Sequence, residues 1–381
     1  MADLTAHPDI VVIGAGIAGA SIAYELAAQR RVLLLERESQ PGYHTTGRSA
    51  AMYAPAYGNP LVRALTRASQ AFYDAPPAGF TDVPLLIARG MLFIGTAERA
   101  EEARQMLAEP QLARILKPLS PQAVIERIPI LRREACVHAL LDETSKDIDA
   151  NALHSGYLRA FKARGGEIVT HAEVRALARD ADGWRIEAGA RELRAPVVVN
   201  AGGAWVDEIA QLAGLAPLGM RPLRRTALIV DAPPGAGIAR WPTAIEIAES
   251  FYFKPDAGRL LICPADETPS PPCDAQPEEI DVAIAVDRFQ TATTVSVQRV
   301  IRKWAGLRTF APDRSPVVGF DPRAEGFFWM AGQGGYGLQM GPALARAAAA
   351  ILLARPLPAD IEAEGVDAAA LAPQRLPGVR P

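Results

Sequence analysis

The chain has 381 residues, of which 49% are hydrophobic and 22% charged, the composition of a globular protein long enough for two domains. Its formal net charge of −3 gives no electrostatic reason to expect a nucleic-acid partner. The three cysteines and five histidines are scattered singly, so we expect no metal site, no disulfide framework and a reducing, cytoplasmic setting.

The N-terminal residues have the pattern of a strand, a glycine-rich turn and a helix. An apolar run at 9–13 is followed by Gly-Ala-Gly-Ile-Ala-Gly at 14–19, an alanine-rich helix to about residue 29 and a second apolar run at 31–36. Short Val, Ile and Leu runs flanking a helix predict a buried parallel βαβ unit. The glycine pattern explains the apolar stretch 10–28 better than a signal peptide or a membrane span does.

Two further strand–turn–helix patterns follow, at 197–213 and at 326–354. The segments between them differ in character. We expect a strand at 85–95, helices at 98–107 and 149–164, antiparallel sheet within 220–312, a surface loop at 264–277 and an irregular tail after residue 355.

The first turn has the arrangement of a dinucleotide-binding site. Gly14 would permit the tight turn, Gly16 would let the backbone approach a pyrophosphate, and Gly19 would let helix and strand pack. Glu36 ends the next strand, where it would accept the adenosine ribose hydroxyls and repel a 2′-phosphate, which disfavours NADP. Strand, glycines, helix, second strand and acid arrive in the required order, so the motif is specific.

Two other segments favour FAD over NAD. The run 45–52 is rich in small and hydroxylated residues that suit a chain crossing a flavin closely. The glycines at 334–337 precede a helix, whose positive N-terminal end would stabilise negative charge on a reduced flavin.

Several ordered blocks resemble the D-amino-acid oxidase family of flavoproteins: DIVVIGAGIAGASIAYELA, PGYHTTGRSAA, VVVNAGGAW, ESFYFKPDAG, KWAGLRTF and EGFFWMAGQGGYG. Within the family the likeness is to bacterial FAD-dependent D-arginine dehydrogenases. The resemblance implies an α/β fold, with a Rossmann-type, glutathione-reductase-like FAD-binding domain and an α+β substrate domain on a mixed, largely antiparallel sheet. We expect the first domain at 1–86, 147–217 and 313–381, and the second at 87–146 and 218–312.

The resemblance also implies how FAD is held. It would be noncovalent, because Gly306 stands in the segment where sarcosine oxidases of the family attach FAD through a cysteine. The residues expected to bind it are Gly14, Gly16, Ile17, Ala18, Gly19, Glu36, Arg37, Thr45, Thr46, Gly47, Arg48, Ser49, Ala50, Ala51, Val174, Gly202, Gly334, Gly335, Tyr336, Gly337, Leu338 and Gln339.

An amino-acid substrate needs a grip on its carboxylate, for which the planar arginine fork is suited. The resemblance places carboxylate contacts at Arg225 and Arg308. Residues that would wall the substrate pocket are Met52, Tyr57, Tyr252, Gly335 and Tyr336. From the residues alone, Arg308 could instead form an internal salt bridge, Arg225 could be one of a structural pair with Arg224, and Tyr252 could be ordinary core.

The reaction implied is oxidative deamination of a D-amino acid, by hydride transfer from Cα to flavin N5, with no side-chain base required. The imino acid would hydrolyse to a 2-oxo acid and ammonia. Met52 replaces a histidine of the D-arginine dehydrogenases, and 85–93 lacks their guanidinium-binding glutamate, so uncharged side chains are expected; Glu246 is a weak substitute acid.

Two other functional readings stay open. The chain could be a related flavin enzyme acting on glycine, sarcosine, proline or a 2-hydroxy acid, or a flavoprotein without turnover. The electron acceptor, quinone or oxygen, is undetermined, and we expect no stable membrane insertion.

Overall fold

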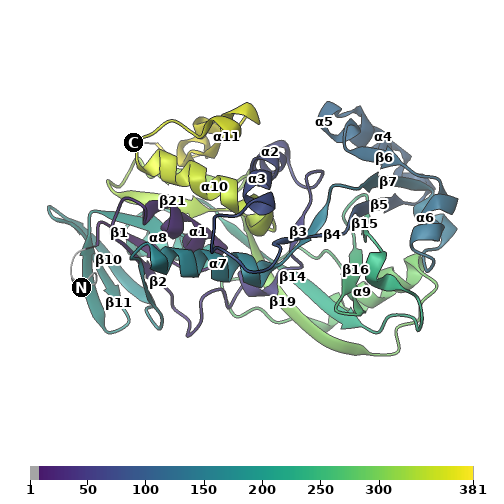
Figure 1. Ribbon diagram of the computed structural model, residues 1–381. Helices are drawn as coiled ribbons and strands as arrows, with labels where there is room; N and C mark the ends of the chain where they lie inside the picture. Colours follow the sequence, from purple (N-terminus) through teal and green to yellow (C-terminus); the bar gives the residue numbers. More distant parts are fainter. Residues whose placement is uncertain (1–7, 381) are drawn as a thin grey trace.

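The computed structural model describes residues 8–380, so residues 1–7 and 381 of the expected domain ranges lie outside the described part. A six-stranded sheet organises one lobe (Figure 1). It is parallel except for one edge strand and runs in the order β20 (Val317–Phe320), β21 (Phe327–Ala331), β13 (Val197–Asn200), β1 (Ile10–Ile13), β2 (Val32–Leu35) and β9 (Glu167–Val169). The predicted βαβ unit is therefore confirmed at the centre of this sheet.

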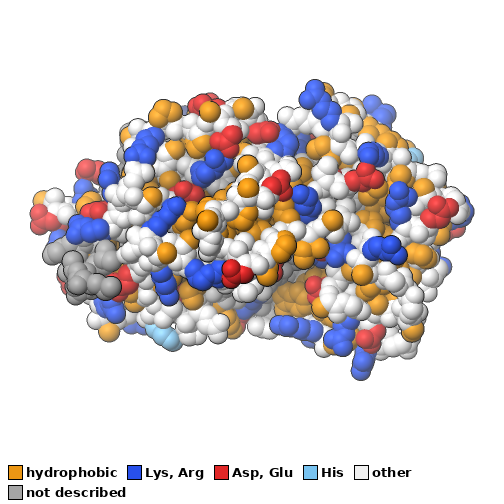
Figure 2. All heavy atoms as spheres, in the orientation of Figure 1, with side chains coloured by type: hydrophobic (Ala, Val, Ile, Leu, Met, Phe, Trp, Pro, Cys, Tyr) orange, Lys and Arg blue, Asp and Glu red, His pale blue; other side chains and the backbone are white. Residues whose placement is uncertain are grey.

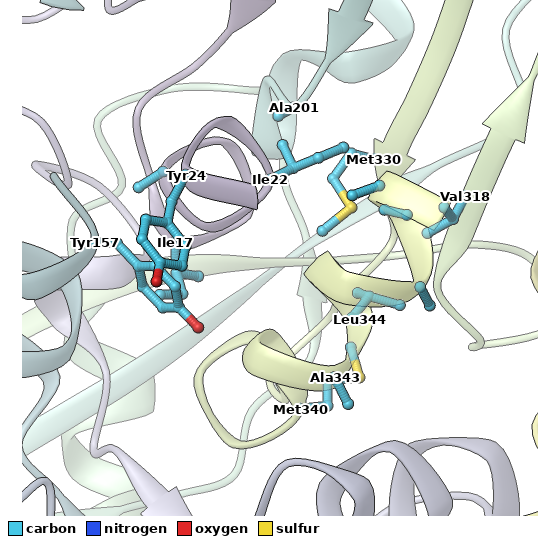
Figure 3. Close-up of a cluster of buried hydrophobic side chains, with 14 of the residues drawn as sticks. Ile17, Ile22, Tyr24, Tyr157, Ala201, Val318, Met330, Met340, Ala343 and Leu344 are labelled. Atoms are coloured by element: carbon cyan, nitrogen blue, oxygen red, sulfur yellow. The ribbon is translucent and has the colours of Figure 1, made fainter. Parts of the chain in front are cut away.

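Both faces of the sheet are covered, which explains the unbroken apolar runs of its strands. Ile10 and Val12 face a core that includes the helices α1 (Ile17–Leu26), α7 (Ala150–Ala163) and α10 (Gly337–Leu352). Figure 3 shows part of this core, with side chains of α1, α7, α10 and β21. Val11 and Ile13 face a second core with α8 (Val206–Leu212) and an antiparallel sheet of β10 (Val174–Asp180), β11 (Gly183–Ala188) and β12 (Arg191–Ala195).

A nine-stranded sheet organises the other lobe. All its pairs are antiparallel except β15–β5. The order is β18 (Thr268–Pro269), β14 (Arg221–Val230), β17 (Arg259–Cys263), β16 (Tyr252–Asp256), β15 (Thr243–Glu246), β5 (Met91–Gly95), β7 (His138–Asp142) and β6 (Leu116–Pro118), with β19 (Val300–Phe310) also paired to β14. The long strands β14 and β19 run between the lobes (Figure 1).

The remaining elements are short. A small sheet of β3 (Met52–Tyr53), β8 (Lys146–Ile148) and β4 (Leu86–Ala88) lies between the lobes. The other helices are α2 (Pro60–Ala68), α3 (Gln70–Asp74), α4 (Ala100–Ala108), α5 (Pro110–Ala113), α6 (Pro121–Arg127), α9 (Glu279–Ala292), α11 (Ala359–Ala363) and α12 (Ala368–Leu371), with 3₁₀ turns at Thr46–Arg48, Ala97–Arg99, Arg133–Cys136, Gly203–Trp205, Ile238–Arg240 and Pro373–Arg375. Within residues 8–380 no helix combines the length and apolarity needed to cross a membrane.

The fold class is confirmed, but three local expectations were wrong. The stretch 85–95 is two strands in different sheets, because the chain turns at Gly90 (φ +76°). Helix α9 was missed within the stretch expected to be sheet, although Ala285, Phe289 and Ala292 bury one face of it. The tail is not irregular but forms α11 and α12 by burying Ile361 and Leu371. The loop 264–277 is as expected apart from the two-residue strand β18.

The two sheets divide the chain in the same way as the expected ranges. Every strand of the six-stranded sheet lies within 1–86, 147–217 or 313–381, and every strand of the nine-stranded sheet lies within 87–146 or 218–312. The exact domain boundaries stay a prediction.

Figure 2 shows acidic and basic side chains interspersed on one face, with the surface hollowed between the two lobes.

Candidate active site

A cavity of about 540 Å³ lies where the carboxyl ends of β1, β2 and β13 meet β19. Its volume is in the range of ligand and cofactor pockets. The carboxyl edge of a parallel sheet is also where open α/β folds bind ligands. The cavity draws its walls from both lobes, so it is the candidate active site.

The glycine turn after β1 forms one end of the cavity. Gly14 has φ +99°, and a Cβ there would meet the Ala201 carbonyl oxygen at 2.6 Å, so the turn requires glycine. At Gly19 a Cβ would collide with the backbone oxygen of Gly14. Helix α1 therefore packs directly on the turn, and its N-terminal end reaches the cavity at Ile17. The Ile17 amide is capped by the Thr46 hydroxyl, which accepts its hydrogen at 3.0 Å.

Glu36 follows β2 and lines the same end of the cavity, where it is buried. One carboxylate oxygen accepts from the Ala15 amide at 2.9 Å, and the other accepts from the Glu38 amide at 3.0 Å. A carboxylate oxygen has two acceptor sites, so each keeps capacity for one more donor. Glu36 is thereby fixed in place and still able to accept hydroxyl donors.

The segment 42–51 crosses the cavity and is held at several points. His154 donates from Nε2 to the Ala15 carbonyl at 2.8 Å and packs beneath Gly42, and its burial lowers its pKa. The Thr45 hydroxyl donates to the Leu307 carbonyl at 2.7 Å. The Arg48 guanidinium donates to the carbonyls of Ala275 and Ala305, both at 2.9 Å. These bonds tie the segment to β19 and to the first lobe.

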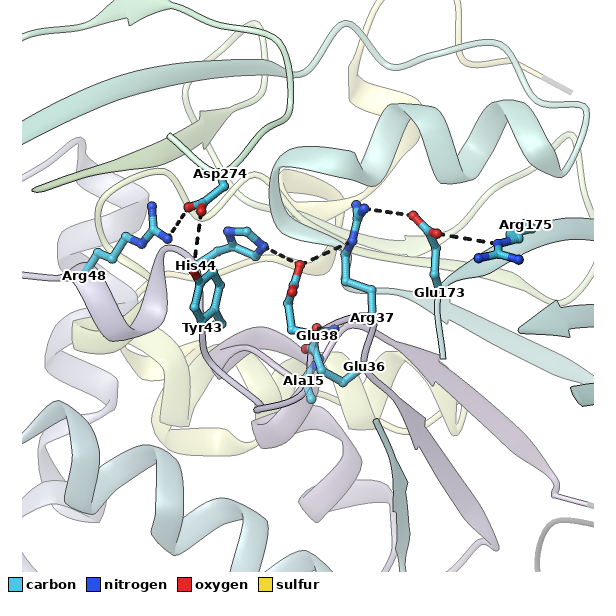
Figure 4. Close-up of polar contacts among 10 residues, drawn as sticks. All are labelled: Ala15, Glu36, Arg37, Glu38, Tyr43, His44, Arg48, Glu173, Arg175 and Asp274. Atoms are coloured by element: carbon cyan, nitrogen blue, oxygen red, sulfur yellow. Dashed lines mark hydrogen bonds and ion pairs between the residues drawn. The ribbon is translucent and has the colours of Figure 1, made fainter. Parts of the chain in front are cut away.

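Charged side chains form a chain of contacts along the mouth of the cavity (Figure 4). Glu38 pairs with His44 at 3.0 Å and with Arg37 at 3.5 Å, and Arg37 continues to Glu173 at 2.8 Å. Aromatic contacts reinforce the chain, because the Trp205 ring packs against both His44 and Arg37.

A second group of contacts continues along the mouth on the far side of His44 (Figure 4). Asp274 accepts hydrogen bonds from Arg48 and, at 3.3 Å, from the Tyr43 hydroxyl. We call Tyr43, Arg48 and Asp274 the clasp, because they join the loop 264–277 to the segment that crosses the cavity.

The glycine run before α10 forms the opposite wall. The Gly334 amide donates to the Thr309 carbonyl at 2.9 Å, which pins the run to β19. A Cβ on Gly335 would lie 2.5 Å from Cζ of Arg308, so the guanidinium can occupy its position only because residue 335 is glycine. The Thr309 hydroxyl is buried beside the cavity and has no hydrogen-bond partner among residues 8–380. A bound group that offered a polar atom would satisfy it.

Arg308 and Arg225 both line the cavity, but within residues 8–380 only Arg225 is paired with a carboxylate. Arg225 donates from Nε to the Asp266 carbonyl at 2.8 Å and from Nη2 to Glu267 at 3.2 Å. Arg308 forms no ion pair with any carboxylate in the described part of the chain. The titratable side chains close to it include the phenols of Tyr57 and Tyr252. A guanidinium is always charged, so Arg308 is the group in this wall that calls for an anionic ligand.

Three tyrosines surround Arg308. Tyr252 on β16 is buried and lines the cavity, while Tyr57 and Tyr336 pack edge-to-face behind it with centroids 5.4 Å apart. Burial raises the pKa of all three phenols, although the charge of Arg308 opposes the shift. The phenols are therefore neutral at physiological pH and can act as hydrogen-bond donors. The Tyr57 hydroxyl donates to Glu249 at 2.9 Å.

The cavity brings together most of the residues expected to bind a cofactor. Those that line it are Gly14, Gly16, Ile17, Ala18, Glu36, Arg37, Thr45, Thr46, Arg48, Ser49, Ala50, Val174, Gly202, Gly334, Gly335, Gly337 and Leu338. Gly19, Gly47, Ala51, Tyr336 and Gln339 lie beside these residues in the chain without lining the cavity. The assignment of individual roles stays a prediction.

Four residues named as substrate contacts or as a substitute acid do not line the cavity: Met52, Tyr57, Tyr336 and Glu246. The Met52 sulfur instead accepts a hydrogen bond from the Thr243 hydroxyl at 3.1 Å. Glu246 is bound by Arg99 at 2.9 Å and by the Ser250 hydroxyl at 2.8 Å, so it is not free to act as a substitute acid.

Sequence reasoning missed several residues of the wall. Tyr43, His44 and Trp205 lie within blocks that it had already singled out, so their neighbours could have suggested them. Glu249 does not line the cavity but binds Tyr57 behind it. No sequence motif marks this residue, because only the turn between β15 and β16, where Glu249 has φ +57°, brings it to Tyr57.

Comparisons with known proteins agree with this geometry. A family model described as FAD dependent oxidoreductase (DAO) matches residues 9–351. The glycine oxidase of Geobacillus kaustophilus (strain HTA426) is 24% identical over 352 residues, which cover 89% of this chain and 91% of that protein. The L-2-hydroxyglutarate dehydrogenase of Escherichia coli O17:K52:H18 is 28% identical over 222 residues, or 55% of this chain and 50% of that one.

Solved structures show the same fold. A crystal structure of glycine oxidase from Geobacillus kaustophilus has a TM-score of 0.83 at 23% identity and covers 98% of this chain and 100% of its own. The dithionite-reduced L-α-glycerophosphate oxidase from Mycoplasma pneumoniae, with FAD bound, has a TM-score of 0.81 at 17% identity over 91% of this chain and 95% of its own. The narrower likeness to D-arginine dehydrogenases finds no support among these relatives.

Proposed function

The chain belongs to the DAO family of FAD-dependent oxidoreductases, and we propose that it catalyses the oxidative deamination of a D-amino acid with an uncharged side chain. FAD is the cofactor, as the sequence predicted. The observation that carries the substrate proposal is the Arg308 guanidinium, which lines the cofactor cavity without a carboxylate partner within residues 8–380.

The residues present fit FAD. Glu36 would accept the ribose hydroxyls of its adenosine, the Gly14 turn would lie against its diphosphate, and the run Gly334–Gly337 would lie beside its ring. The attachment is proposed to be noncovalent, because no cysteine lines the cavity. When bound, the flavin supplies a hydride acceptor for the substrate Cα–H bond.

Arg308 would grip the substrate carboxylate through two parallel N–H donors. Gly335 gives the guanidinium the space to lie flat against the wall, and Tyr252 would add a neutral hydroxyl donor. The grip orients the substrate, and orientation is the main catalytic contribution that these residues can make. The amine must be neutral so that its lone pair can assist loss of the hydride, and its proton would pass to the solvent.

The proposal of an uncharged side chain rests on the acids near the cavity. Glu246 is occupied by Arg99 and Glu267 by Arg225 and Arg314, so neither is free to pair with a substrate guanidinium. Glu249 accepts the hydrogen bond of the Tyr57 hydroxyl and does not line the cavity. Burying a cation without a counter-charge costs several kcal/mol. D-arginine and D-lysine should therefore be poor substrates.

A related substrate class is the second candidate. The names of the relatives, glycine oxidase and L-2-hydroxyglutarate dehydrogenase, favour glycine or a 2-hydroxy acid, and sarcosine and proline belong to the same alternative. Each of these also carries a carboxylate that Arg308 could bind. The structure of this wall therefore does not distinguish these substrate classes, and their reaction rates must be compared directly.

Anaerobic reduction of the bound flavin separates the candidates. We expect D-alanine, D-methionine or another uncharged D-amino acid to bleach the flavin faster than its L-enantiomer, glycine, sarcosine, proline or L-2-hydroxyglutarate, each supplied at equal concentration. Stopped-flow absorbance gives the rates. Faster bleaching by a hydroxy acid would move the assignment to the second candidate, and a preference for D-arginine by orders of magnitude would refute the side-chain proposal.

Retention of FAD should depend on the clasp. Asp274→Asn removes the charge that holds Arg48, so we expect FAD to dissociate about fivefold faster, a modest change because Asp274 is half exposed. The hydrogen bond from Arg48 lowers the pKa of Asp274, so the wild-type rate of FAD dissociation should stay low above the usual aspartate pKa and rise by about the same fivefold as pH falls through the lowered value. Release is followed by the rise of free-flavin fluorescence.

Asp231→Asn is the matched control for the clasp. Asp231 is an exposed aspartate that pairs with Arg299 and Arg259 and lines neither the cavity nor its mouth. Equal dissociation rates for Asp274→Asn and Asp231→Asn would show that the clasp does not hold FAD.

The cellular setting is proposed from the same observations. The three cysteines are free, which suits the reducing cytoplasm. The partners proposed are an amino-acid substrate and an electron acceptor, either a quinone or oxygen.

A further inference from the structure

A second cavity of about 480 Å³ lies directly behind the segment that crosses the first. Tyr43, Arg48, Ser49 and Ala50 line both cavities, so a single stretch of backbone separates them. The second cavity opens between β17, β19 and the loop 264–277, on the opposite side of this stretch from the cofactor. None of the residues assigned to the substrate lines it.

The walls of the second cavity combine a flat aromatic surface with two exposed charged side chains, Arg302 and Asp256, neither of which has an ion-pair partner among residues 8–380. The Trp304 indole is half-buried and fixed by its N–H, which donates to the Arg48 carbonyl at 2.9 Å. The Arg302 guanidinium lies over the Trp304 ring with its Cζ 5.6 Å from the centroid. Leu261 and Ala275 add buried apolar surface.

Arg302 differs from its neighbours on and beside β19. Arg299 pairs with Asp231, and Lys303 pairs with Glu279, whereas Arg302 has no ion-pair partner among residues 8–380. Arg48, the other cation of this cavity, is paired with Asp274 and donates to two carbonyls. The free guanidinium of the second cavity is therefore Arg302.

We propose that the second cavity binds the electron acceptor, and that the acceptor is a planar aromatic carbonyl compound of the quinone class. Its ring would take the place of the Arg302 guanidinium on the Trp304 indole, and a carbonyl oxygen would accept from the displaced guanidinium, whose charge favours the more electron-rich, reduced oxygen. Molecular oxygen requires neither an indole platform nor a guanidinium. This inference rests on the proposed oxidoreductase function but not on the identity of the amino-acid substrate.

The electron balance is complete with the groups named. Conversion of a quinone to its quinol consumes two electrons and two protons. Reoxidation of the reduced cofactor releases two electrons and one proton, and water supplies the second proton. The electrons need to cross only the stretch at Ser49 and Ala50 that both cavities share.

The test uses holoenzyme reduced with dithionite, which makes it independent of the amino-acid substrate. Reoxidation by 2-methyl-1,4-naphthoquinone is followed by stopped-flow absorbance, and its binding to oxidised holoenzyme is followed by equilibrium dialysis. We expect saturable binding in both wild type and Arg299→Ala. Arg302→Ala should weaken binding and slow reoxidation by about tenfold, the effect of losing one hydrogen bond to a charged group.

Two results with the naphthoquinone would overturn the proposal. One is the absence of saturable naphthoquinone binding to wild-type holoenzyme. The other is an Arg302→Ala variant whose binding and reoxidation match those of Arg299→Ala. Reoxidation by dissolved oxygen serves as the internal reference and should be the same in all three proteins; a parallel tenfold loss with oxygen would mean that Arg302 acts on the flavin itself and would also contradict an acceptor site.

Discussion

Arg308→Met should lower kcat/KM for the preferred amino acid by about 100-fold, because two hydrogen bonds between charged groups are lost from a largely dry site. Methionine keeps much of the side-chain volume, so the cavity should not collapse. FAD content, measured by absorbance after denaturation, should match wild type, since none of the predicted cofactor contacts is removed. Steady-state kinetics on the preferred amino acid provide the measurement.

Arg225→Met is the matched comparison for Arg308. Arg225 already spends Nε on the Asp266 carbonyl and Nη2 on Glu267, so its removal should cost less than about tenfold in kcat/KM. Unchanged kinetics in Arg308→Met would remove Arg308 from the site. A larger loss in Arg225→Met than in Arg308→Met would transfer the carboxylate to Arg225.

Gly335→Ala should disturb the same site without removing a charged group. The added Cβ would lie 2.5 Å from Cζ and 2.6 Å from Nε of Arg308, so the guanidinium must move by the order of 1 Å. A displacement of that size in a positioning group can cost about 100-fold in rate. The fold should survive, because the atoms that must move are the far end of a flexible side chain.

The control for Gly335→Ala is Gly341→Ala. Gly341 lies in α10, where a Cβ would make an ordinary 3.5 Å contact with Ile17, so kinetics should not change and the helix should become slightly more stable. Kinetics and thermal melts of both variants test the pair. Wild-type kinetics in Gly335→Ala would show that the position of the Arg308 guanidinium does not matter.

Local sequence pattern was enough to predict the cofactor end of the site. The strand, the turn at Gly14, α1 and Glu36 are contiguous, and each has a conformational or chemical requirement that the residue type reveals. The family resemblance added the fold class and the mixed sheet, which no periodicity could have specified across a chain whose sheets are assembled from distant segments.

Contacts between distant segments could not be predicted from pattern. Asp274 meets Tyr43 across 231 positions, and whether Arg308 or Arg225 is paired depends on where the loop carrying Glu267 comes to lie. From residue type alone, Arg225 and Arg308 were equally suited to bind the substrate carboxylate. Only the folded chain shows that Arg225 already has a carboxylate partner.

The missed helix α9 and the misjudged tail have a common cause. These helices have narrow apolar faces, and they form because those faces pack against a hydrophobic core. Ala285 and Phe289 of α9 pack in this way in the core of the second lobe. Intrinsic propensity is weak beside such packing.

The most direct test of the account is a titration of oxidised holoenzyme with propionate, an unreactive carboxylate, and with propionamide, its neutral analogue of similar size. Propionate should perturb the visible flavin spectrum with a saturating concentration dependence, and Arg308→Met should abolish the effect. Propionamide should produce little change. Equal perturbation by the two compounds, or none by either, would contradict a carboxylate site formed by Arg308 beside the flavin.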